Sequence, residues 1–179
     1  MEKHLDKAVF AGGCFWCTEA VFTRINGVEK VTSGYTGGFV KNPAYREVCN
    51  CTTGHAEGIQ IEFDKSKVSY SDLLEVFFAT HNPTTMNRQG NDMGTQYRSA
   101  IFYTTEEQKE IAKGYIDLLE KEKVFEDFIV TKIVKFEVFY EAEENHQEYY
   151  NNNKEQSYCQ VMISPKIKKL KAHYADKLK

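Results

Sequence analysis

The chain has few prolines, a single tryptophan and no long apolar run. It holds 179 residues and only three prolines, and charged residues interrupt every hydrophobic segment before it reaches the roughly 18 residues that a membrane-spanning helix needs. The first residues, MEKHLDKAVFAGG, also lack the apolar core of a secretory signal peptide. We therefore expect no transmembrane helix and a cytoplasmic location.

Strong charge of one sign is missing as well. The formal net charge is −3, which gives no reason to expect a nucleic-acid or membrane partner. Lysines gather only in residues 165–179, which we interpret as a solvated tail or helix face. A chain of this length with 41% apolar residues can bury one sizeable core. Because no repeat or linker divides it, we expect a single domain over residues 1–179 and a monomer.

Cysteine is present but not in a disulfide pattern. The five cysteines are Cys14, Cys17, Cys49, Cys51 and Cys159. An odd number in a chain without a signal peptide argues against a structural disulfide framework. Catalytic or metal-binding thiols are the alternatives.

The stretch GGCFWC, residues 12–17, is the strongest local signal. KAVFA, residues 7–11, predicts a short strand, the two glycines predict a tight turn, and residues 14–25 predict a helix. If the helix begins near Cys14, its sulfur lies at the positive end of the helix dipole. That position stabilises a thiolate, so we expect a lowered pKa and a nucleophilic Cys14.

The C-x-x-C spacing leaves two further readings open. Cys17 lies one helical turn after Cys14, so the pair fits a general thiol–disulfide oxidoreductase. It also fits half of a zinc site, for which Cys49, Cys51 and the nearby His55 are the other candidates.

Aromatic and acidic side chains suggest a pocket beside the cysteines. Phe15 and Trp16 are either core residues or the walls of an apolar pocket for a group such as a methyl, and we favour the pocket because Trp16 should be partly exposed. Glu57 opens an alternating strand, and a carboxyl in an aromatic pocket is held neutral and can donate a proton. We interpret the three histidines of the loops and helices as structural or solvated: His55, His81 and His146.

The remaining pattern predicts a mixed α and β domain. Strands are expected at residues 28–35, 56–64, 97–103 and 130–138, and helices at 71–81, 105–122 and 141–150, with irregular loops at 38–55 and 81–95. Ser69 with Asp72, and Thr105 with Gln108, have the spacing of helix capping boxes. The order β-α-β-β-α-β predicts an α+β plait with a mixed sheet and extra helices and loops.

Four motifs in order resemble a known family. GCFWCTEAVF, GYTGG, YREVCNCTTGHAEG and GNDMGTQYRS are similar to the A class of peptide methionine sulfoxide reductases, over about residues 7–160. The resemblance implies a ferredoxin-like two-layer plait and no metal or organic cofactor. It implies reduction of the S epimer of methionine sulfoxide, in proteins and as the free amino acid.

The resemblance also implies roles for individual residues. Cys14 would be the nucleophile and Glu57 the acid for the sulfoxide oxygen. Oxidised Cys14 would be a sulfenic acid, which a second thiol converts to a disulfide that a thioredoxin-type donor reduces. The other implied site residues are Phe15 and Trp16 for the methyl, Tyr158 for the pocket lining, Tyr45 and Tyr97 for hydrogen bonds to the oxygen, and Asp92 for the polar side of the pocket.

The sequence departs from the family at two cysteines. Cys17 and Cys51 stand where many members have glycine, and we assign no role to Cys51. Cys49 occupies a position where the family often has a cysteine, and we interpret it as structural. Cys159, in SYCQVM, matches the Tyr-Cys of two-cysteine members if a mobile segment from about residue 151 folds over the site. We favour Cys159 over Cys17 as the resolving thiol, and a relay through both stays open.

Overall fold

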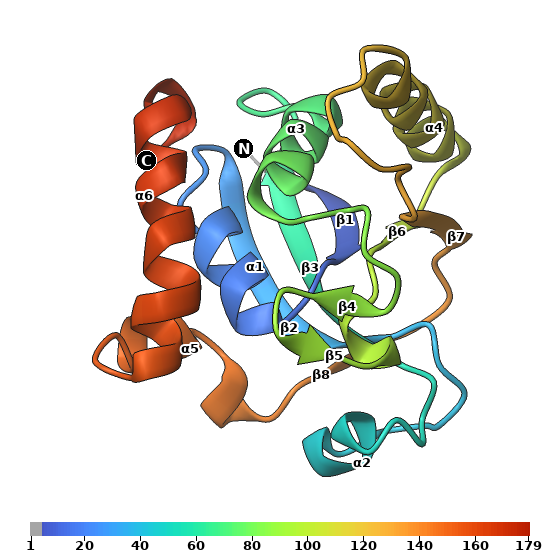
Figure 1. The fold of residues 1–179 in the computed structure, drawn as a ribbon, viewed down its shortest axis with the longest axis vertical. Coiled ribbons are helices and arrows are strands. Elements are labelled where there is room, and N and C mark those ends of the chain that lie inside the picture. Colours follow the sequence, from blue (N-terminus) through green and yellow to red (C-terminus); the bar gives the residue numbers. More distant parts are fainter. Residues whose placement is uncertain (1–4) are drawn as a thin grey trace.

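The computed structural model describes residues 5–179, and residues 1–4 of the N-terminal stretch lie outside the described part (Figure 1). The strands are β1 (Leu5–Ala11), β2 (Val28–Thr36), β3 (Ala56–Asp64), β4 (Arg88–Gln89), β5 (Asp92–Met93), β6 (Ala100–Tyr103), β7 (Lys132–Lys135) and β8 (Phe139–Glu141). The helices are α1 (Phe15–Phe22), α2 (Tyr45–Cys49), α3 (Tyr70–Thr80), α4 (Glu106–Lys121), α5 (Tyr149–Asn152) and α6 (Ser164–His173), joined by short 3₁₀ and π turns.

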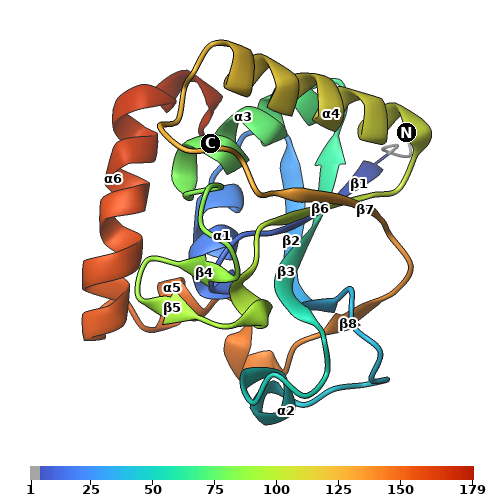
Figure 2. The same cartoon turned by 45° about the vertical axis from the view of Figure 1, so that its right-hand side comes forward.

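Six strands form one curled, mixed sheet in the order β7-β6-β1-β3-β2-β8, with only β6 and β7 parallel (Figure 2). Strands β7 and β8 form opposite edges, yet only residues 136–138 separate them. These few residues reach at most about 14 Å, whereas five strand spacings of a flat sheet span about 24 Å. The edges must therefore curl toward each other. The α+β class with a mixed sheet is confirmed.

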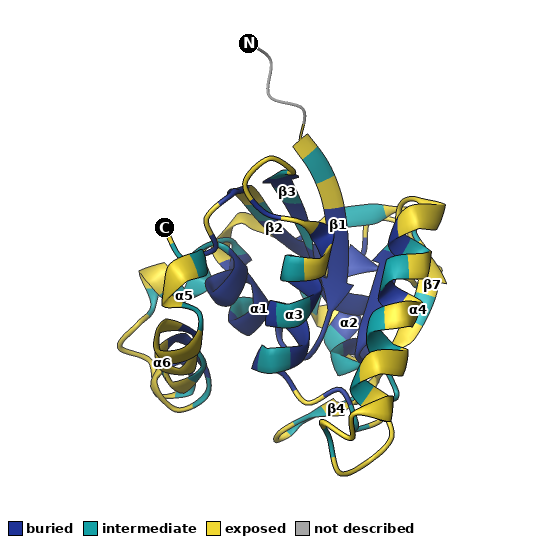
Figure 3. Cartoon of the chain, turned by 90° about the horizontal axis from the view of Figure 1, so that it is seen from above, coloured by how far each residue is buried: buried dark blue, intermediate teal, exposed yellow. Residues whose placement is uncertain are grey.

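Both faces of the sheet are buried. Ala8 and Phe10 of β1 point into the main core, beneath α1 and α3. The alternate residues Val9 and Ala11 point to a smaller core on the other face, which Phe139 helps to cover. Figure 3 shows the buried strands between the helices. A strand buried on two faces needs a continuous apolar run, which explains KAVFA.

Several predicted elements are confirmed. Strand β3 has the predicted bounds of residues 56–64. Helix α3 begins at a capping box in which the Asp72 N–H donates to Ser69 Oγ and the Ser69 N–H donates to Asp72 Oδ2, both at 3.0 Å. Helix α4 begins where the Gln108 N–H donates to Thr105 Oγ1 at 3.1 Å.

Other predicted elements are wrong. The strand expected at 130–138 is shorter, because only Lys132–Lys135 pairs with β6 as β7. Residues 136–138 connect it to β8 at the opposite edge of the sheet. The helix expected at 141–150 is instead the end of β8, a 3₁₀ turn at Glu144–His146 and the single turn of α5. It is interrupted because Glu148 adopts a left-handed φ of 51°. The loops at 38–55 and 81–95 contain α2 and the β4–β5 hairpin.

The C-terminal segment packs on the domain as helix α6. Ile163, Ile167 and Leu170 are buried in the main core, while most lysines of the segment face solvent. Lys177 donates to Asp72 at 2.9 Å and to Glu75 at 3.2 Å, both on α3. Within residues 5–179, no helix is long and apolar enough to cross a membrane.

Candidate active site

Two glycines set Cys14 at the start of α1. Gly13 has a φ of +87°, and a Cβ there would lie 2.7 Å from the Gln89 side chain, so only glycine fits. Cys14 is the N-cap residue of the helix, with φ −64° and ψ 129°. The strand, turn and helix predicted for this motif are confirmed.

The charge of the thiol pair differs from expectation. Burial, the hydrogen bond to Cys17 and the nearby Glu57 carboxyl raise the pKa of Cys14, and the Trp16 backbone N–H lowers it only in part. The Cys14 thiol hydrogen-bonds to the Cys17 sulfur, which lowers the pKa of Cys17 to about 7, and the charge of Lys166 adds to this effect. The expected lowering at Cys14 is therefore wrong for the free protein, because burial outweighs the helix terminus. Cys17 is therefore the thiol that ionises more readily, and the Cys14 thiol keeps its proton and donates it to the Cys17 sulfur.

Glu57 is a buried carboxyl on β3 directly beside this turn. Its side chain is 1% exposed, and Oε1 accepts a hydrogen bond from the Phe15 N–H at 3.3 Å. Its Oε2 has no hydrogen-bond partner within residues 5–179. Burial, with the charges of Asp92 and Cys17, raises the pKa of Glu57 to about 8. The carboxyl is therefore mostly protonated at neutral pH and has one oxygen free to donate.

Two phenols lie near the same carboxyl. Burial and the charge of Glu57 raise the pKa of Tyr45 and of Tyr97, so both remain O–H donors. The Tyr45 hydroxyl hydrogen-bonds to the Cys49 sulfur, which agrees with a structural role for Cys49. Asp92 differs from Glu57 in its partner, because its Oδ2 accepts a hydrogen bond from the Tyr158 hydroxyl at 2.7 Å.

An aromatic wall surrounds the cysteine pair. Trp16 is half-buried and stacks on Tyr149 with ring centroids 3.7 Å apart. Its Nε1–H donates to His146 Nδ1 at 3.1 Å. The Tyr158 ring is nearly perpendicular to the Trp16 ring, with ring centroids 5.7 Å apart. Phe15 is fully buried against Tyr35, Tyr45 and His146.

The sequence did not reveal three of these aromatic residues. His146 and Tyr149 lie in the stretch expected to form a helix at 141–150, and Tyr35 lies in a predicted strand, so no spacing linked them to Trp16. The only signal was the run of polar and aromatic residues in HQEYY. The structural role expected for His146 agrees with its buried hydrogen bond to Trp16.

A third thiol lies on the same side as Cys17. The Tyr158 hydroxyl is 3.9 Å from the Cys17 sulfur, and the neighbouring Cys159 is fully buried. Burial and the charge of Cys17 raise the pKa of Cys159. The charge of Cys17 thus raises the pKa of both Cys14 and Cys159.

The family-model comparison decides the identity of the chain. The model described as peptide methionine sulfoxide reductase matches residues 6–178. The chain belongs to the peptide methionine sulfoxide reductase family. Enzymes of this family are peptide-methionine (S)-S-oxide reductases.

Individual relatives of this reductase agree with the family assignment. The peptide methionine sulfoxide reductase MsrA of Deinococcus radiodurans is 56% identical over 97% of this chain and 84% of its own length. The reduced form of Mxr1 from Saccharomyces cerevisiae matches with a TM-score of 0.77 at 33% identity, covering 87% of this chain and 89% of Mxr1. Mxr1 in complex with Trx2 matches with a TM-score of 0.54 at 23% identity, covering 83% and 89%, and this likeness concerns the fold alone.

Cys51, His55 and His81 of the reductase make contacts apart from the thiol pair. Cys51 is exposed and donates to Gln96 Oε1 at 3.0 Å. His55 accepts the Gly38 N–H at 2.9 Å, and His81 lies between Phe77 and Ser99. All five cysteines are free thiols. Within residues 5–179, no three or more His, Cys, Asp or Glu side chains are grouped as metal ligands, so the structure does not bring together the residues considered for a zinc site.

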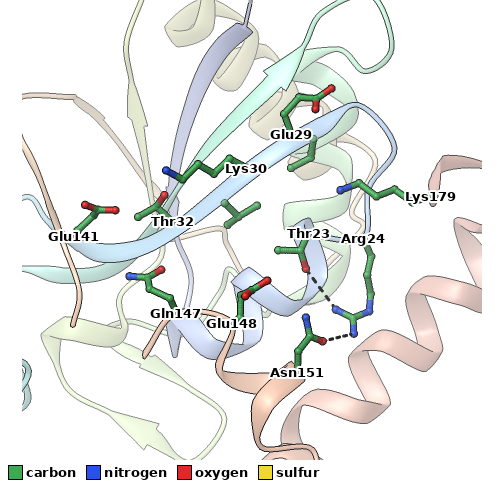
Figure 4. A pocket seen from close by; sticks show the side chains of 12 residues that line it. Thr23, Arg24, Glu29, Lys30, Thr32, Glu141, Gln147, Glu148, Asn151 and Lys179 are labelled. Atoms are coloured by element: carbon green, nitrogen blue, oxygen red, sulfur yellow. Dashed lines mark hydrogen bonds between the residues drawn. The ribbon is translucent and has the colours of Figure 1, made fainter. Parts of the chain in front are cut away.

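A cavity of about 650 Å³ lies away from these residues (Figure 4). Polar and charged side chains line it, including Arg24, Glu141 and Lys179. It contains none of the predicted site residues, but Gln147 and Glu148 at its edge directly follow His146. The reactive thiol pair is therefore separate from this cavity.

Proposed function

We propose that this reductase acts on methionine (S)-sulfoxide, in proteins and as the free amino acid, with Cys14 as nucleophile and Glu57 as acid. The observation that carries the proposal is the buried Glu57 carboxyl, with one free oxygen and a pKa raised to about 8. Sulfoxide reduction needs a proton donor because the oxygen gains negative charge as the sulfur is attacked. A simple thiol–disulfide exchange expels a thiolate, which is much less basic than a departing oxygen and depends less on such a donor.

The Cys14–Cys17 hydrogen bond supplies the nucleophile. A proton shift along this bond moves the negative charge from Cys17 to Cys14, whose thiolate attacks the sulfoxide sulfur. Glu57 protonates the oxygen, and Tyr45 and Tyr97 donate hydrogen bonds to it. The protonated oxygen passes as a hydroxyl group from the substrate sulfur to the Cys14 sulfur, and the transient bond between the two sulfurs breaks. The substrate sulfur thereby gains two electrons and leaves as the thioether of methionine. The Cys14 sulfur loses two electrons and becomes a sulfenic acid.

The aromatic residues hold the methyl group and so orient the chiral sulfur. Phe15, Trp16 and Tyr158 form this apolar wall in the proposal, and the stacking of Trp16 on Tyr149 supports it. Asp92 supports the polar side through its hydrogen bond from Tyr158. A pocket with one apolar side and one hydrogen-bonding side accepts only one epimer.

Recycling passes through a relay of thiols. Cys17 is hydrogen-bonded to Cys14 and ionises most readily, so we propose that it condenses first with the sulfenic acid and releases water. Cys159 then attacks the Cys17 sulfur, and Cys14 leaves as a thiol. Because Cys159 is buried, presenting its disulfide requires the segment from about residue 151 to move.

A thioredoxin-type dithiol reduces the final disulfide in this proposal. The relative Mxr1 has been crystallised in complex with Trx2, which supports that class of donor. Every residue of the proposed site lies in one packed unit, which supports a single domain. The strand order β6-β1-β3-β2 with α1 and α3 as crossovers supports a ferredoxin-like plait at the centre of the fold.

The proposal is tested with the two separate epimers of methionine sulfoxide and thioredoxin as donor. We expect turnover of the S epimer, little with the R epimer, and none with Cys14→Ser. Insulin disulfides serve as the alternative substrate. Reduction of insulin with both epimers untouched would replace the proposal with the general oxidoreductase.

A further inference from the structure

An irregular segment forms the outer side of the aromatic wall. Residues 142–149, here called the strap, carry His146 and Tyr149 onto Trp16. The strap contains one 3₁₀ turn and a left-handed residue, Glu148. Its first residue is fixed to β2 by the Ala142 N–H, which donates to the Ser33 carbonyl at 2.9 Å. The rest of the strap has irregular backbone, so side chains must fix it.

A buried carboxyl lies under the strap. Glu19 of α1 is 3% exposed, and its Oε2 accepts a hydrogen bond from Ser33 Oγ of β2 at 2.7 Å. The backbone N–H of Glu148 lies close enough to lower the pKa of this carboxyl, although burial raises that pKa to about 7 overall. Glu19 therefore joins three elements: the helix that carries Trp16, the strand β2 and the end of the strap.

Gln147 completes the connection to β2. The Ser33 N–H donates to Gln147 Oε1 at 2.9 Å, and Gln147 Nε2 donates to the Ser33 carbonyl at 2.8 Å. The same Nε2 donates to the Ala142 carbonyl at 3.1 Å. Ser33 thus binds the strap through its backbone and Glu19 through its hydroxyl.

We propose that Glu19 is a positioning residue that fixes the strap and thereby holds Trp16 for substrate. Glu19 and Trp16 are three residues apart on α1, so the helix grips the strap at two neighbouring points. The proposal rests on the role proposed above for Trp16 in the substrate pocket. It gives a function to a buried acid that does not touch the reacting atoms.

The chemistry requires an acceptor at position 19. The Ser33 hydroxyl and the Glu148 N–H are both donors aimed at one side chain. Glutamine keeps an oxygen with two lone pairs, so Glu19→Gln retains the anchor. Glu19→Ala leaves both donors without their acceptor and releases the strap.

The test compares Glu19→Ala and Glu19→Gln in single-turnover reduction of S-sulfoxide. For Glu19→Ala we expect about a tenfold higher half-saturating substrate concentration, with a maximal rate within about threefold of wild type. Emission from Trp16, the only tryptophan, should change in the free protein. Glu19→Gln should restore both values, and the exposed Glu110→Ala is the matched control.

Further variants keep the proposal falsifiable. If Glu19→Ala does not fold, Ser33→Ala and Gln147→Ala must produce the same shift in half-saturation and emission. Unchanged half-saturation and emission in the folded variants would overturn the anchor. Trp16→Ala separates the two proposals. If it leaves half-saturation unchanged, the substrate role of Trp16 has failed. Trp16 emission, measured in the Glu19 variants, then still reports on the position of the strap.

Discussion

The Glu57 carboxyl of β3 is bound to the backbone N–H of Phe15 at 3.3 Å, in the first turn of the helix that follows Cys14. The two residues are 42 positions apart in the chain. In the proposed mechanism this hydrogen bond fixes the acid, Glu57, relative to the nucleophile, because Phe15 is the next residue after Cys14. It occupies one carboxyl oxygen, and the other oxygen has no hydrogen-bond partner within residues 5–179.

The raised pKa of Glu57 predicts a falling limb in the pH–rate profile. We expect the single-turnover rate to fall as pH rises through about 8, because the carboxylate form cannot donate a proton. Glu57→Gln should lower the rate by about 100-fold or more and remove this limb. Glu62→Gln on the same strand is the control. A Glu57→Gln variant with the wild-type rate would remove Glu57 from the chemical step.

The raised pKa of Glu57 also predicts how the free energy of unfolding depends on pH. The pKa of Glu57 is raised from 4.5 to about 8 on folding, so the folded protein holds this proton more tightly than the unfolded chain. The resulting contribution to stability is fully present below about pH 4.5 and is lost as pH rises through 8. Glu57→Gln should therefore stabilise the protein at pH 9, by an amount on the order of a few kcal/mol.

Urea unfolding of both proteins at pH 5 and pH 9 measures this difference. The comparison with wild type cancels the titration of groups that do not sense the Glu57 charge. Equal free energies of unfolding at pH 9 would mean that the folded protein does not penalise the ionised carboxyl.

The order of the thiol relay predicts different trapped species. After one turnover without reductant, Cys17→Ser should hold Cys14 as sulfenic acid. Cys159→Ser should hold a Cys14–Cys17 disulfide and lose turnover with thioredoxin. Mass spectrometry of non-reduced digests identifies each species. Cys51→Ser, which changes an exposed thiol bound to Gln96, is the control and should resemble wild type. A direct Cys14–Cys159 disulfide in Cys17→Ser, with full turnover, would make Cys159 the first resolving thiol.

Two neighbouring tyrosines give a matched test of the aromatic wall. Tyr149 stacks on Trp16, whereas Tyr150 contacts Ser164 and Arg24. Tyr149→Leu should raise the half-saturating sulfoxide concentration by about 2- to 10-fold, since an aromatic pair contributes about 0.5–1.5 kcal/mol. Tyr150→Leu should leave it unchanged. Equal effects of the two variants would show that the stack does not shape the substrate pocket.

Local patterns predicted elements whose stability is local. The capping residues Ser69 and Thr105 and the alternation in residues 56–64 marked α3, α4 and β3 because those signals depend on neighbours in sequence. The segment 130–138 shows the limit of such signals. Its alternation fits one strand, but the strand ends at Lys135, and residues 136–138 leave this edge of the curled sheet for the opposite edge at β8.

The sequence by itself determined the local structure around the thiols and Glu57. GGCFWC predicted a turn and the start of a helix, and the alternation in residues 56–64 predicted the strand that carries Glu57. Only the tertiary structure decided the ionisation of the thiols. The pKa of Cys14 depends on burial by distant segments and on Glu57, and that of Cys17 on Lys166 of α6 and on Tyr158. The strap's hold on Trp16 likewise depends on Glu19 and Ser33. Charge and burial act through space, so the order of residues along the chain does not reveal them.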